Sequence, residues 1–432
     1  MEKPRLKVLI IAHEFSPVQG SECAEGWNLV TRIAKYHDVT VIYASTNQSG
    51  NAGYVDAVNN YIQFNSTIDG LTFVDIEQPK LTKLLALINL KFKSLSAIGL
   101  PFIYFTGYKF WQKAAFKTAK QLHTTNHFDV VHQLTQITFR EPGYSWKLGI
   151  PFVWGPTGGN SQLPKEFNQY LSFRSRILES FRSFSNYYQF NFITRIIQAN
   201  RKAALIYAYS KEDAILFAER ASGKVKLMLD AGTYNGFARP GNMYTGNKKL
   251  KGIWCGQLNE RKAPSILLQA LAKDSVTKEM IDFLIIGSGP LKEAMHKMAE
   301  SLNLKNIQWI EKVSHDEIFK LMGEADVFVH TSLREATSNV IPEALSMGLP
   351  VICHDVNGMS VAIDESCGIK IPLVSPGNSI NGFHEAIRRL IVDRKLFDKL
   401  RTGAKNRALE ISWENMAEII ANDYLSIIKQ KI

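Results

Sequence analysis

Short apolar runs alternate with helical patterns along almost the whole chain of 432 residues, and this alternation restricts the folds open to it. Several runs are continuously apolar, such as KVLIIA (7–12) and VTVIYAS (39–45). Continuous apolar runs of this length are typical of strands buried on both faces of a parallel sheet. Because the chain is too long for one ordinary core, the pattern predicts an α/β protein with two domains.

The expected strands fall into two groups, separated by a polar segment rich in Gly, Pro, Asn and Lys at 236–249, which is the expected linker. In the first group the expected strands are 7–12, 39–45, 71–76, 128–134, 151–156, 203–210 and 225–232. In the second they are 251–258, 283–289, 307–313, 326–332, 350–356 and 368–374. We predict two doubly wound, Rossmann-like domains facing a central cleft, over 1–238 and 239–411. A C-terminal helix over 412–432 is expected to pack back toward the N-terminal domain.

Cysteine usage and hydropathy indicate the compartment. Cys23, Cys255, Cys353 and Cys367 are widely spaced and form neither a CxxC pair nor a zinc-binding pattern, so we expect reduced thiols in a cytoplasmic protein. The apolar run near the start, VLIIA, reads as a first strand and not as a signal peptide. No run reaches the roughly 18 apolar residues that a membrane-spanning helix needs.

The net charge of +11 belongs to the first half, where residues 1–240 hold 27 Lys and Arg against 17 Asp and Glu. Residues 78–128 contain eight lysines and no acidic residue, interleaved with large apolar side chains, and a second basic and aromatic stretch runs over 173–195. This combination suits an anionic membrane surface, at the inner face of the membrane. The alternative is a solvated lysine face on buried helices. Nucleic acid is not an expected partner, because the chain has no RNP, KH or zinc-knuckle signature.

The segment REATSNVIPEALSMG (334–348) carries two glutamates, Glu335 and Glu343, directly after an expected strand. Ligands bind at this carboxyl edge in doubly wound sheets. The expected helix begins with Ser338 as its N-cap, and its first amides, near Asn339 and Val340, suit phosphate oxygens. Glu343 could accept hydrogen bonds from a ribose diol, and Glu335 could face a sugar. Alternatively, Glu343 offsets the helix dipole and Glu335 pairs with its neighbour, Arg334.

A second motif, CGQLNERKAPS (255–265), follows the first strand of the second group. Its strand ends at Gly256, and the adjacent cations Arg261 and Lys262 could clamp a diphosphate. In IIGSGP (285–290), two glycines would let the backbone approach a ligand.

Two candidate positions lie in the first half. Gly20 shapes the first strand-to-helix loop, whose amides could also face an anion. His132 lies within an apolar strand, where a core histidine is the plain interpretation.

Together these motifs resemble the family 4 retaining glycosyltransferases of the two-Rossmann-domain (GT-B) architecture, in a bacterial polysaccharide-synthesis subset. The element E-x7-E from Glu335 to Glu343 carries most of the resemblance, with GQLNERK ending at Lys262. IIGSGP, SWENMA (412–417), SPVQGSE and WGPTGG also fit. The chain departs from the family at Ala336, Leu134 and Lys312, where glycine, histidine and glycine are usual.

The resemblance implies specific roles for these residues. Arg261 and Lys262 would bind the donor diphosphate, Glu335 would face the donor sugar, and His132 is the candidate for an acceptor-side catalytic role. The remaining donor-binding positions would be Gly20, Gly256, Val313, Ser338, Asn339, Val340 and Glu343.

By the same resemblance, the activity would be transfer of a sugar from a UDP- or GDP-sugar to a hydroxyl of a glycan or lipid-linked acceptor, with retention of configuration. No convincing DxD cluster is present, so neither a metal nor a further cofactor is expected. Two alternatives stay open: a sugar-nucleotide epimerase of the same architecture, and a catalytically silent partner in a polysaccharide assembly complex.

Overall fold

The structure, a computed structural model, describes residues 4–65, 67–92, 98–234 and 249–430. The chain divides into two compact units. The first unit comprises Met1–Asn160, Asn186–Asp230 and Trp413–Ile432, and the second comprises Ser161–Ser185 and Ala231–Ser412. The expected linker at 236–249, and with it the boundary at 238, lies outside the described residues except for Lys249.

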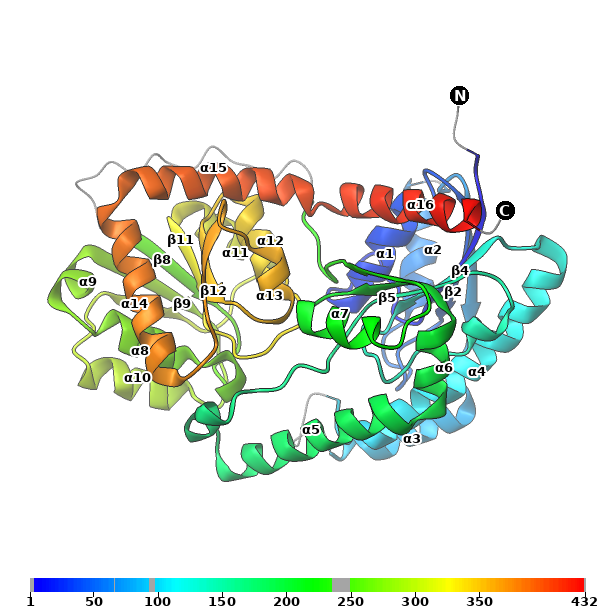
Figure 1. Ribbon diagram of the computed structural model, residues 1–432. Coiled ribbons are helices and arrows are strands. Elements are labelled where there is room, and N and C mark those ends of the chain that lie inside the picture. Colours follow the sequence, from blue (N-terminus) through cyan, green and yellow to red (C-terminus); the bar gives the residue numbers. More distant parts are fainter. Residues whose placement is uncertain (1–3, 66, 93–97, 235–248, 431–432) are drawn as a thin grey trace. The chain divides into compact units, whose positions relative to one another are not determined.

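The first unit is built on a seven-stranded parallel sheet in the order β3-β2-β1-β4-β5-β6-β7 (Figure 1). Its strands are β1 (Lys7–Ala12), β2 (Asp38–Ala44), β3 (Leu71–Ile76), β4 (Val130–Thr135), β5 (Phe152–Thr157), β6 (Ala203–Ala208) and β7 (Lys224–Leu227). The central strands β1, β4 and β5 are buried almost throughout, which explains their continuous apolar runs.

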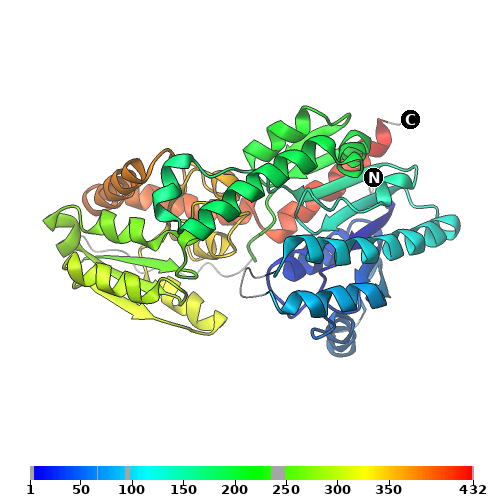
Figure 2. The same cartoon turned by 90° about the horizontal axis from the view of Figure 1, so that it is seen from below.

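Most helices of the first unit lie between these strands in chain order, and the last one follows the second unit. They are α1 (Glu22–Ile33), α2 (Tyr54–Asn65), α3 (Lys80–Leu90), α4 (Pro101–Asn126), the short η1 (Ser145–Lys147), α6 (Thr194–Lys202), α7 (Lys211–Ala218) and α16 (Trp413–Lys429). The long helix α5 (Phe173–Phe192) runs from residues of the second unit into residues of the first. Figure 2 shows α3 and α4, in blue and cyan, lying side by side.

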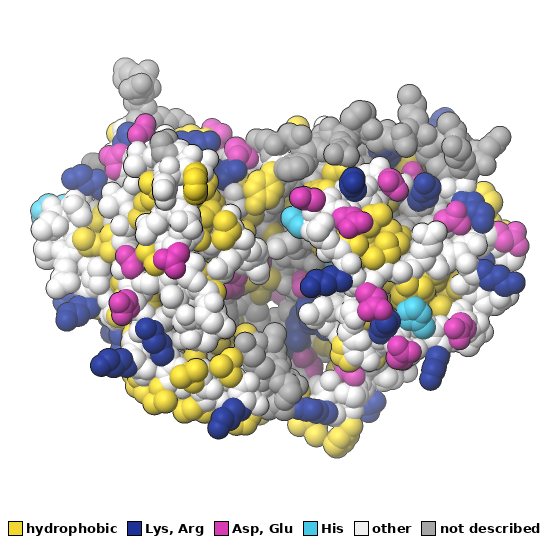
Figure 3. Space-filling view, turned by 180° about the vertical axis from the view of Figure 1, so that it is seen from behind, with side chains coloured by type: hydrophobic (Ala, Val, Ile, Leu, Met, Phe, Trp, Pro, Cys, Tyr) yellow, Lys and Arg dark blue, Asp and Glu magenta, His cyan; other side chains and the backbone are white. Residues whose placement is uncertain are grey.

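Helix α3 is exposed along most of its length, because only Thr82 and Asn89 of its residues are buried. Leu81, Leu84 and Leu87 are all exposed, although apolar residues of this size usually lie in a core. Hydrophobic side chains gather at the lower edge of the first unit in Figure 3, with Lys and Arg side chains beside them. The alternative of a lysine face on a buried helix therefore fails for α3. It fits α4, which buries Tyr108 and Trp111 and exposes its lysines on the opposite side.

The C-terminal helix α16 packs against α1, so the expectation that it returns to the N-terminal domain is confirmed. Arg32 Nε lies 2.6 Å from Glu414 Oε1, and His37 Nε2 lies 3.0 Å from the carbonyl oxygen of Ala421. The helix α16 therefore completes the packing of the first unit, although it lies almost 400 positions along the chain from the residues that it contacts.

The second unit contains a six-stranded parallel sheet in the order β10-β9-β8-β11-β12-β13. Its strands are β8 (Leu250–Cys255), β9 (Ile281–Ile286), β10 (Ile307–Ile310), β11 (Val327–His330), β12 (Val351–His354) and β13 (Gly368–Ile371). In both sheets the third strand pairs with the second, the second with the first, and the first with the fourth. This is the doubly wound order, so the predicted pair of Rossmann-like domains is confirmed.

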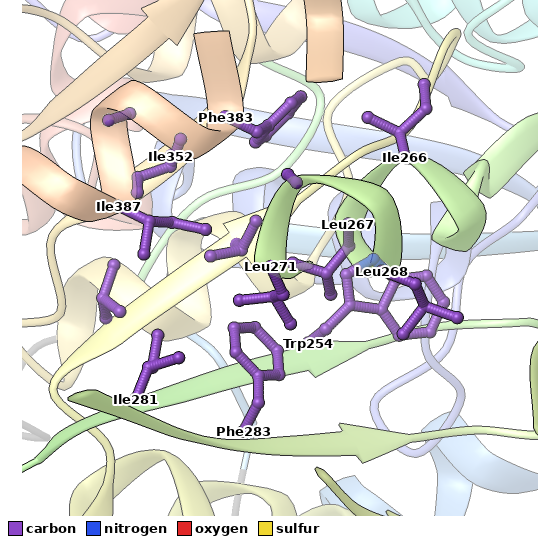
Figure 4. Close-up of a cluster of buried hydrophobic side chains, with 14 of the residues drawn as sticks. Trp254, Ile266, Leu267, Leu268, Leu271, Ile281, Phe283, Ile352, Phe383 and Ile387 are labelled. Atoms are coloured by element: carbon purple, nitrogen blue, oxygen red, sulfur yellow. The ribbon is translucent and has the colours of Figure 1, made fainter. Parts of the chain in front are cut away.

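The helices of the second unit cover its sheet. They are η2 (Lys165–Tyr170), η3 (Glu260–Lys262), α8 (Pro264–Leu271), α9 (Ser275–Met280), α10 (Lys292–Ser301), α11 (His315–Glu324), α12 (Val340–Ser346), α13 (Asn357–Ala362), α14 (Pro376–Val392) and α15 (Arg394–Glu410). Helices α8 and α14 pack on the sheet and bury an apolar cluster that includes Trp254, Phe283, Phe383 and Ile387 (Figure 4).

Residues 161–185 lie inside the stretch predicted for the N-terminal domain, yet the structure assigns them to the second unit. Phe167 is fully buried in the apolar cluster of that unit, and Tyr170 Oη accepts a hydrogen bond of 2.9 Å from Gln269 Nε2. The chain thus enters the second unit before it completes the first. Local patterning does not reveal this, because it depends on partners about 100 residues away.

Every expected strand is present, with ends that differ by a few residues. The four cysteines are buried and unpaired, as expected for reduced thiols. Within the described ranges, no helix has the length and apolar character that crossing a membrane requires.

Candidate functional site

The turn after β8 presents Arg261 and Lys262 in a fixed conformation. Asn259 caps η3, accepting a 3.0 Å hydrogen bond from the Lys262 amide through its side-chain oxygen. The hydroxyl of Thr331 donates to the Lys262 carbonyl oxygen over 2.8 Å, and the amide of Leu333 donates to that of Arg261 over 2.9 Å. The loop after β11 therefore holds both cations in place from the neighbouring strand.

Glu335 lies between these two cations. Its Oε2 atom is 2.6 Å from Arg261 Nη1 and 2.7 Å from Lys262 Nζ, and it accepts a 2.9 Å hydrogen bond from Ser332 Oγ. Lys262 Nζ also lies 3.3 Å from the hydroxyl oxygen of Ser338. The structure therefore brings four of the expected site residues into one group, which we call the basic node: Arg261, Lys262, Glu335 and Ser338.

The alternative that Glu335 pairs with Arg334 is wrong. Arg334 binds both carboxylate oxygens of Glu179 on α5, at 2.6 and 2.5 Å. Glu179 also forms an ion pair with Arg182. Burial would raise the pKa of Glu179, but the guanidinium groups of Arg182 and Arg334 outweigh burial and lower that pKa. Sequence reasoning missed Glu179, because a single acid 155 positions away from its partner leaves no local signal.

The basic node carries more positive than negative charge. Burial would raise the pKa of Glu335, but Lys262 and Arg261 outweigh it and lower that pKa to about 2. Burial lowers the pKa of Lys262, and the attraction of Glu335 offsets this only in part. The lowered pKa of Glu335 and the lowered pKa of Lys262 have a common cause. The carboxylate is attracted by two cations, whereas each cation is attracted by one carboxylate and repelled by the other cation. A largely enclosed site with this surplus, in which Lys262 is buried and Arg261 is partly exposed, favours an added anion.

Helix α12 begins differently from the expectation. Asn339 occupies the N-cap position with helical backbone angles and without a side-chain capping bond, so the prediction of Ser338 as the N-cap is wrong. Ser338 instead contacts Lys262 through its hydroxyl group, and its carbonyl oxygen accepts from the Ile341 amide over 2.9 Å. Val340 is the first residue of α12.

Glu343 lies one turn into α12, with 17% of its side chain exposed. Burial raises its pKa, and His315 at 3.8 Å offsets only part of this effect. Val313 lies two residues before His315 and is half-buried, between the exposed residues Lys312 and Ser314 that lead into α11. The segment expected to meet the base therefore continues into the helix whose first residue contacts Glu343.

The glycines after β9 serve the packing of the loop itself. A Cβ atom on Gly287 would lie 1.8 Å from the Gly256 carbonyl oxygen, and one on Gly289 would lie 2.5 Å from that of Leu258. These glycines let two backbone segments approach each other, and the expectation that they also admit a ligand stays a prediction. A Cβ on Gly256 would meet side-chain atoms of Trp254 and Lys262 at ordinary distances of 3.4–3.6 Å, so its expected role toward a ligand stays a prediction.

Gly358, in the first turn of α13, was not singled out from the sequence. A Cβ atom there would lie 2.3 Å from Thr337 Oγ1 and 2.5 Å from the Ala336 carbonyl oxygen. Helix α13 thus packs against the segment 336–338, which contains Ala336, one of the positions where the sequence departs from the family that it resembles. The signal was the dipeptide Asn-Gly at a strand end, where Asn357 adopts a positive φ of 50°.

His132 is a structural residue, contrary to its predicted catalytic role. The ring is fully buried in β4, with Nδ1 2.6 Å from Tyr424 Oη and Nε2 2.6 Å from the Gly155 carbonyl oxygen. Because a carbonyl oxygen only accepts, Nε2 carries the proton and Nδ1 accepts from the tyrosine hydroxyl. Burial lowers the pKa of His132 to about 4, so the ring is neutral at pH 7 and both nitrogens are occupied.

Gly20 belongs to the first unit, in the loop between β1 and α1. A Cβ atom at this position would meet no heavy atom within 4 Å, so the loop is open on this side. Its expected role beside a donor phosphate stays a prediction.

Sequence comparison places the basic node within a known family pattern. Residues 246–407 match the family described as "Glycosyl transferases group 1". This segment contains every donor-binding residue expected in the second unit, from Gly256 to Glu343.

Curated relatives match part of the chain. It is 31% identical to a D-inositol 3-phosphate glycosyltransferase of Streptomyces bingchenggensis over 188 residues, which cover 41% of this chain and 40% of that protein. It is 25% identical over 151 residues to the GPI3 subunit of phosphatidylinositol N-acetylglucosaminyltransferase of Saccharomyces cerevisiae, covering 35% and 33%. The chain therefore spans about two fifths of these relatives' length, or less.

Solved structures resemble the chain over nearly its whole length. Sucrose-phosphate synthase from Thermosynechococcus elongatus gives a TM-score of 0.61 at 15% identity, covering 99% of this chain and all of the other. HepE of Anabaena in complex with UDP gives 0.59 at 16% identity, covering 98% and 100%. At these identities the likeness shows a shared fold.

Proposed function

We propose that this protein is a glycosyltransferase that moves a sugar from a UDP- or GDP-sugar to a hydroxyl group, with retention of anomeric configuration. The observation that carries the proposal is the buried basic node, in which Arg261 and Lys262 converge on one carboxylate oxygen. The match of residues 246–407 to group 1 glycosyltransferases supports it. So do relatives named for transfer to inositol-containing acceptors and a structural neighbour that holds UDP.

In the proposed reaction, the bond between the sugar C1 and the β-phosphate oxygen breaks, and a bond forms between C1 and the acceptor oxygen on the same face. The acceptor proton passes to the departing phosphate. Arg261 and Lys262 stabilise the negative charge that develops on that phosphate, which is the main catalytic contribution. The node needs little rearrangement for this, because the turn after β8 and the loop after β11 already hold both cations.

The other expected residues receive roles around this centre. Glu343 would accept hydrogen bonds from the ribose hydroxyls, and Asn339 and Val340 would face the phosphates. Glu335 would turn from the cations toward the donor sugar as the diphosphate replaces it. We propose that no metal is needed, since the two cations supply the charge that a divalent ion would otherwise supply, and that transfer continues in the presence of EDTA.

Replacing Lys262 by alanine tests the node. We expect Lys262→Ala to lower kcat by about 10²–10³, the range seen when one charge-stabilising donor is removed. Lys305→Ala, at an exposed lysine of the same unit, is the matched control and should leave kcat unchanged. Wild-type turnover by Lys262→Ala would remove the clamp from the mechanism.

Incubation with the donor alone separates the two alternatives. An epimerase converts the donor without a second substrate, whereas a transferase gives a glycoside only when an acceptor is present. A silent partner gives neither transfer nor donor hydrolysis. The basic node argues against the silent partner, because two cations that share one carboxylate leave a net positive charge that a bound anion would balance.

We further propose that the first unit docks on an anionic membrane surface, which suits a lipid-linked acceptor in polysaccharide synthesis. Helix α3 exposes Leu84 at 53% and Leu87 at 56% of their areas, beside the exposed lysines Lys80 and Lys83. The part of α5 that belongs to the first unit also exposes large side chains, namely Tyr187, Tyr188 and Phe192. Apolar side chains that insert between lipids, flanked by cations that meet anionic head groups, are the requirements of such a surface.

A further inference from the structure

Residues 161–185 belong to the second unit, although in the sequence they interrupt the first. We call them the inserted segment. Phe167 anchors this segment in the apolar cluster of the second unit. The amide of Ser172 donates a 3.0 Å hydrogen bond to Glu260 Oε1 in η3, the short helix that carries both cations of the basic node. The inserted segment therefore contacts the cation-bearing turn of the node.

The same segment contacts the other loop of the node through Glu179. Arg334, the residue directly before Glu335, donates through Nη1 to both carboxylate oxygens of Glu179, at 2.6 and 2.5 Å. Arg182 lies one turn later on α5 and donates to Glu179 Oε1 at 2.7 Å and to the Ser161 carbonyl oxygen at 2.6 Å. Because these bonds within the inserted segment hold the carboxylate in place, Glu179 is a preformed partner for Arg334.

Arg334 lies close enough to the node to compete for its carboxylate. The Arg334 carbonyl oxygen accepts a 3.1 Å hydrogen bond from Arg261 Nη1, and the same nitrogen lies 2.6 Å from Glu335 Oε2. Only 28% of the Arg334 side chain is exposed. Burial and the charges of Arg182 and Arg261 lower its pKa, against the attraction of Glu179. A guanidinium in this position that lost its carboxylate would carry an uncompensated charge, and Glu335 is the next carboxylate along the chain.

We propose that Glu179 is a positioning residue for the donor site. By binding Arg334, it leaves Glu335 to the two cations of the basic node. This choice of partner is a property of the free protein, whereas its effect on the donor rests on the function proposed above. Without Glu179, the charge of Arg334 would draw Glu335 away from the node. Lys262 would then lose the carboxylate that offsets its burial.

This exchange of partners has a defined signature in the pKa of Lys262. Burial lowers that pKa, Glu335 raises it in part, and Arg261 lowers it. Cys255 and His330 also lie near Lys262, but both are neutral at pH 7. Burial raises the pKa of Cys255 to about 11 and lowers that of His330 well below its usual value. Losing Glu335 therefore lowers the pKa of Lys262 further. Since a phosphate needs the charged amine, affinity for a diphosphate would be full below this pKa and would fall as the pH rises through it.

Lysine-selective NMR on the full chain measures this pKa directly. With isotope-labelled lysine, the ε-methylene signal of Lys262 is identified by its absence in Lys262→Arg and followed from about pH 7 to about pH 11. We expect Lys262 to titrate at a lower pH in Glu179→Gln than in wild type. Glu166→Gln makes the same change at an exposed carboxylate of the inserted segment and should leave the titration unchanged.

UDP affinity, measured by isothermal titration calorimetry on the same samples, tests the consequence for the donor. We expect Glu179→Gln to bind UDP at least about fivefold more weakly than wild type at about pH 8, within the range of coupling between contacting residues. Its affinity should also begin to fall at a lower pH. The double variant Glu179→Gln/Arg334→Gln removes the competing charge as well. Both its UDP affinity and its Lys262 titration should return toward those of wild type.

The double variant separates positioning from a purely structural role. It also lacks Glu179, so a residue needed only to hold α5 in place predicts no recovery. The proposal would be overturned by an unchanged Lys262 titration or an unchanged UDP affinity in Glu179→Gln, or by no recovery in the double variant. Failure of wild type to bind UDP would instead contradict the transferase proposal. The Lys262 titration would still decide whether Glu179 positions Glu335.

Discussion

Glu335 accepts from Arg261, Lys262 and Ser332 at the same time, and this concentration of donors sets its protonation. Its side chain is only 17% exposed and that of Lys262 only 8%, so solvent screens this ion pair weakly, whereas Arg261 is 40% exposed and its pair is screened more. In the function that we propose, a phosphate oxygen of the donor would take the position of this carboxylate between the two cations. The residue thus links the stability of the free protein to the binding that we propose.

Replacing Glu335 by glutamine should make this link measurable through pH. The lowered pKa of Glu335, about 2, means that its contribution to the free energy of unfolding is present above its ordinary value near 4.5 and disappears as the pH falls through 2. We expect the free energy of unfolding of the wild type to exceed that of Glu335→Gln by about 3 kcal/mol at pH 7. Urea midpoints measured from pH 7 to pH 3 should show a constant difference down to about pH 5 and a narrowing below it. A difference independent of pH would contradict the ion-pair account.

His132 shows how a residue type can mislead. The resemblance implies an acceptor-side role for His132, yet hydrogen bonds to Tyr424 and Gly155 use both ring nitrogens. The partner that settles its role lies 292 positions away on α16.

At the scale of elements, α16 carries buried polar contacts in addition to its apolar face. Asp423 accepts from Tyr207 Oη over 2.8 Å and pairs with Lys226 at 2.5 Å, while Tyr424 donates to His132. These bonds reach β4, β6 and β7, so the helix connects three strands of the first sheet. Hydrogen bonds of this kind fix the register of a helix that apolar packing alone would allow to slide.

Replacing Tyr424 by phenylalanine should loosen the first unit. The substitution removes one hydroxyl and leaves His132 Nδ1 buried without a donor, which costs about 1–3 kcal/mol. Amide hydrogen exchange of β4 should accelerate correspondingly, and that of β11 in the second unit should not. Tyr36→Phe, at an exposed position of the same unit, is the control. Unchanged exchange in β4 would show that the His132–Tyr424 bond contributes nothing to stability.

At the scale of the whole molecule, the surplus of positive charge lies in residues 1–240, while residues 241–432 are nearly balanced with 24 Lys and Arg against 23 Asp and Glu. The first half combines its charge with the exposed apolar side chains of α3 and α5.

Vesicle sedimentation tests the membrane proposal. We expect binding to vesicles of phosphatidylglycerol and phosphatidylcholine to exceed binding to phosphatidylcholine alone, and to weaken as salt shortens the screening length. Leu87→Gln should reduce the bound fraction several-fold, and Leu409→Gln should not, although Leu409 is similarly exposed at 61% on α15. Equal recovery with neutral and anionic vesicles would contradict the proposal and leave a protein partner or a second copy as the occupant of α3.

Much of the fold was predictable, because strands buried on both faces of a sheet are continuously apolar whatever their partners. The strand positions and the pair of doubly wound domains followed from this pattern. The return of residues 161–185 to the second unit did not, since Phe167 and Tyr170 have no local feature that names their partners.

The candidate site divides in the same way. The sequence by itself determined the two glutamates, the Arg261–Lys262 pair and the strand ends that carry them, because short motifs record which chemistry a loop presents. Only the tertiary structure decided that Glu335 pairs with both cations, that Arg334 belongs to Glu179, that the glycines after β9 serve backbone packing, and that His132 is structural. The physical reason is that a side chain's charge state and partners depend on burial and on atoms far along the chain, which become neighbours only when the sheets form.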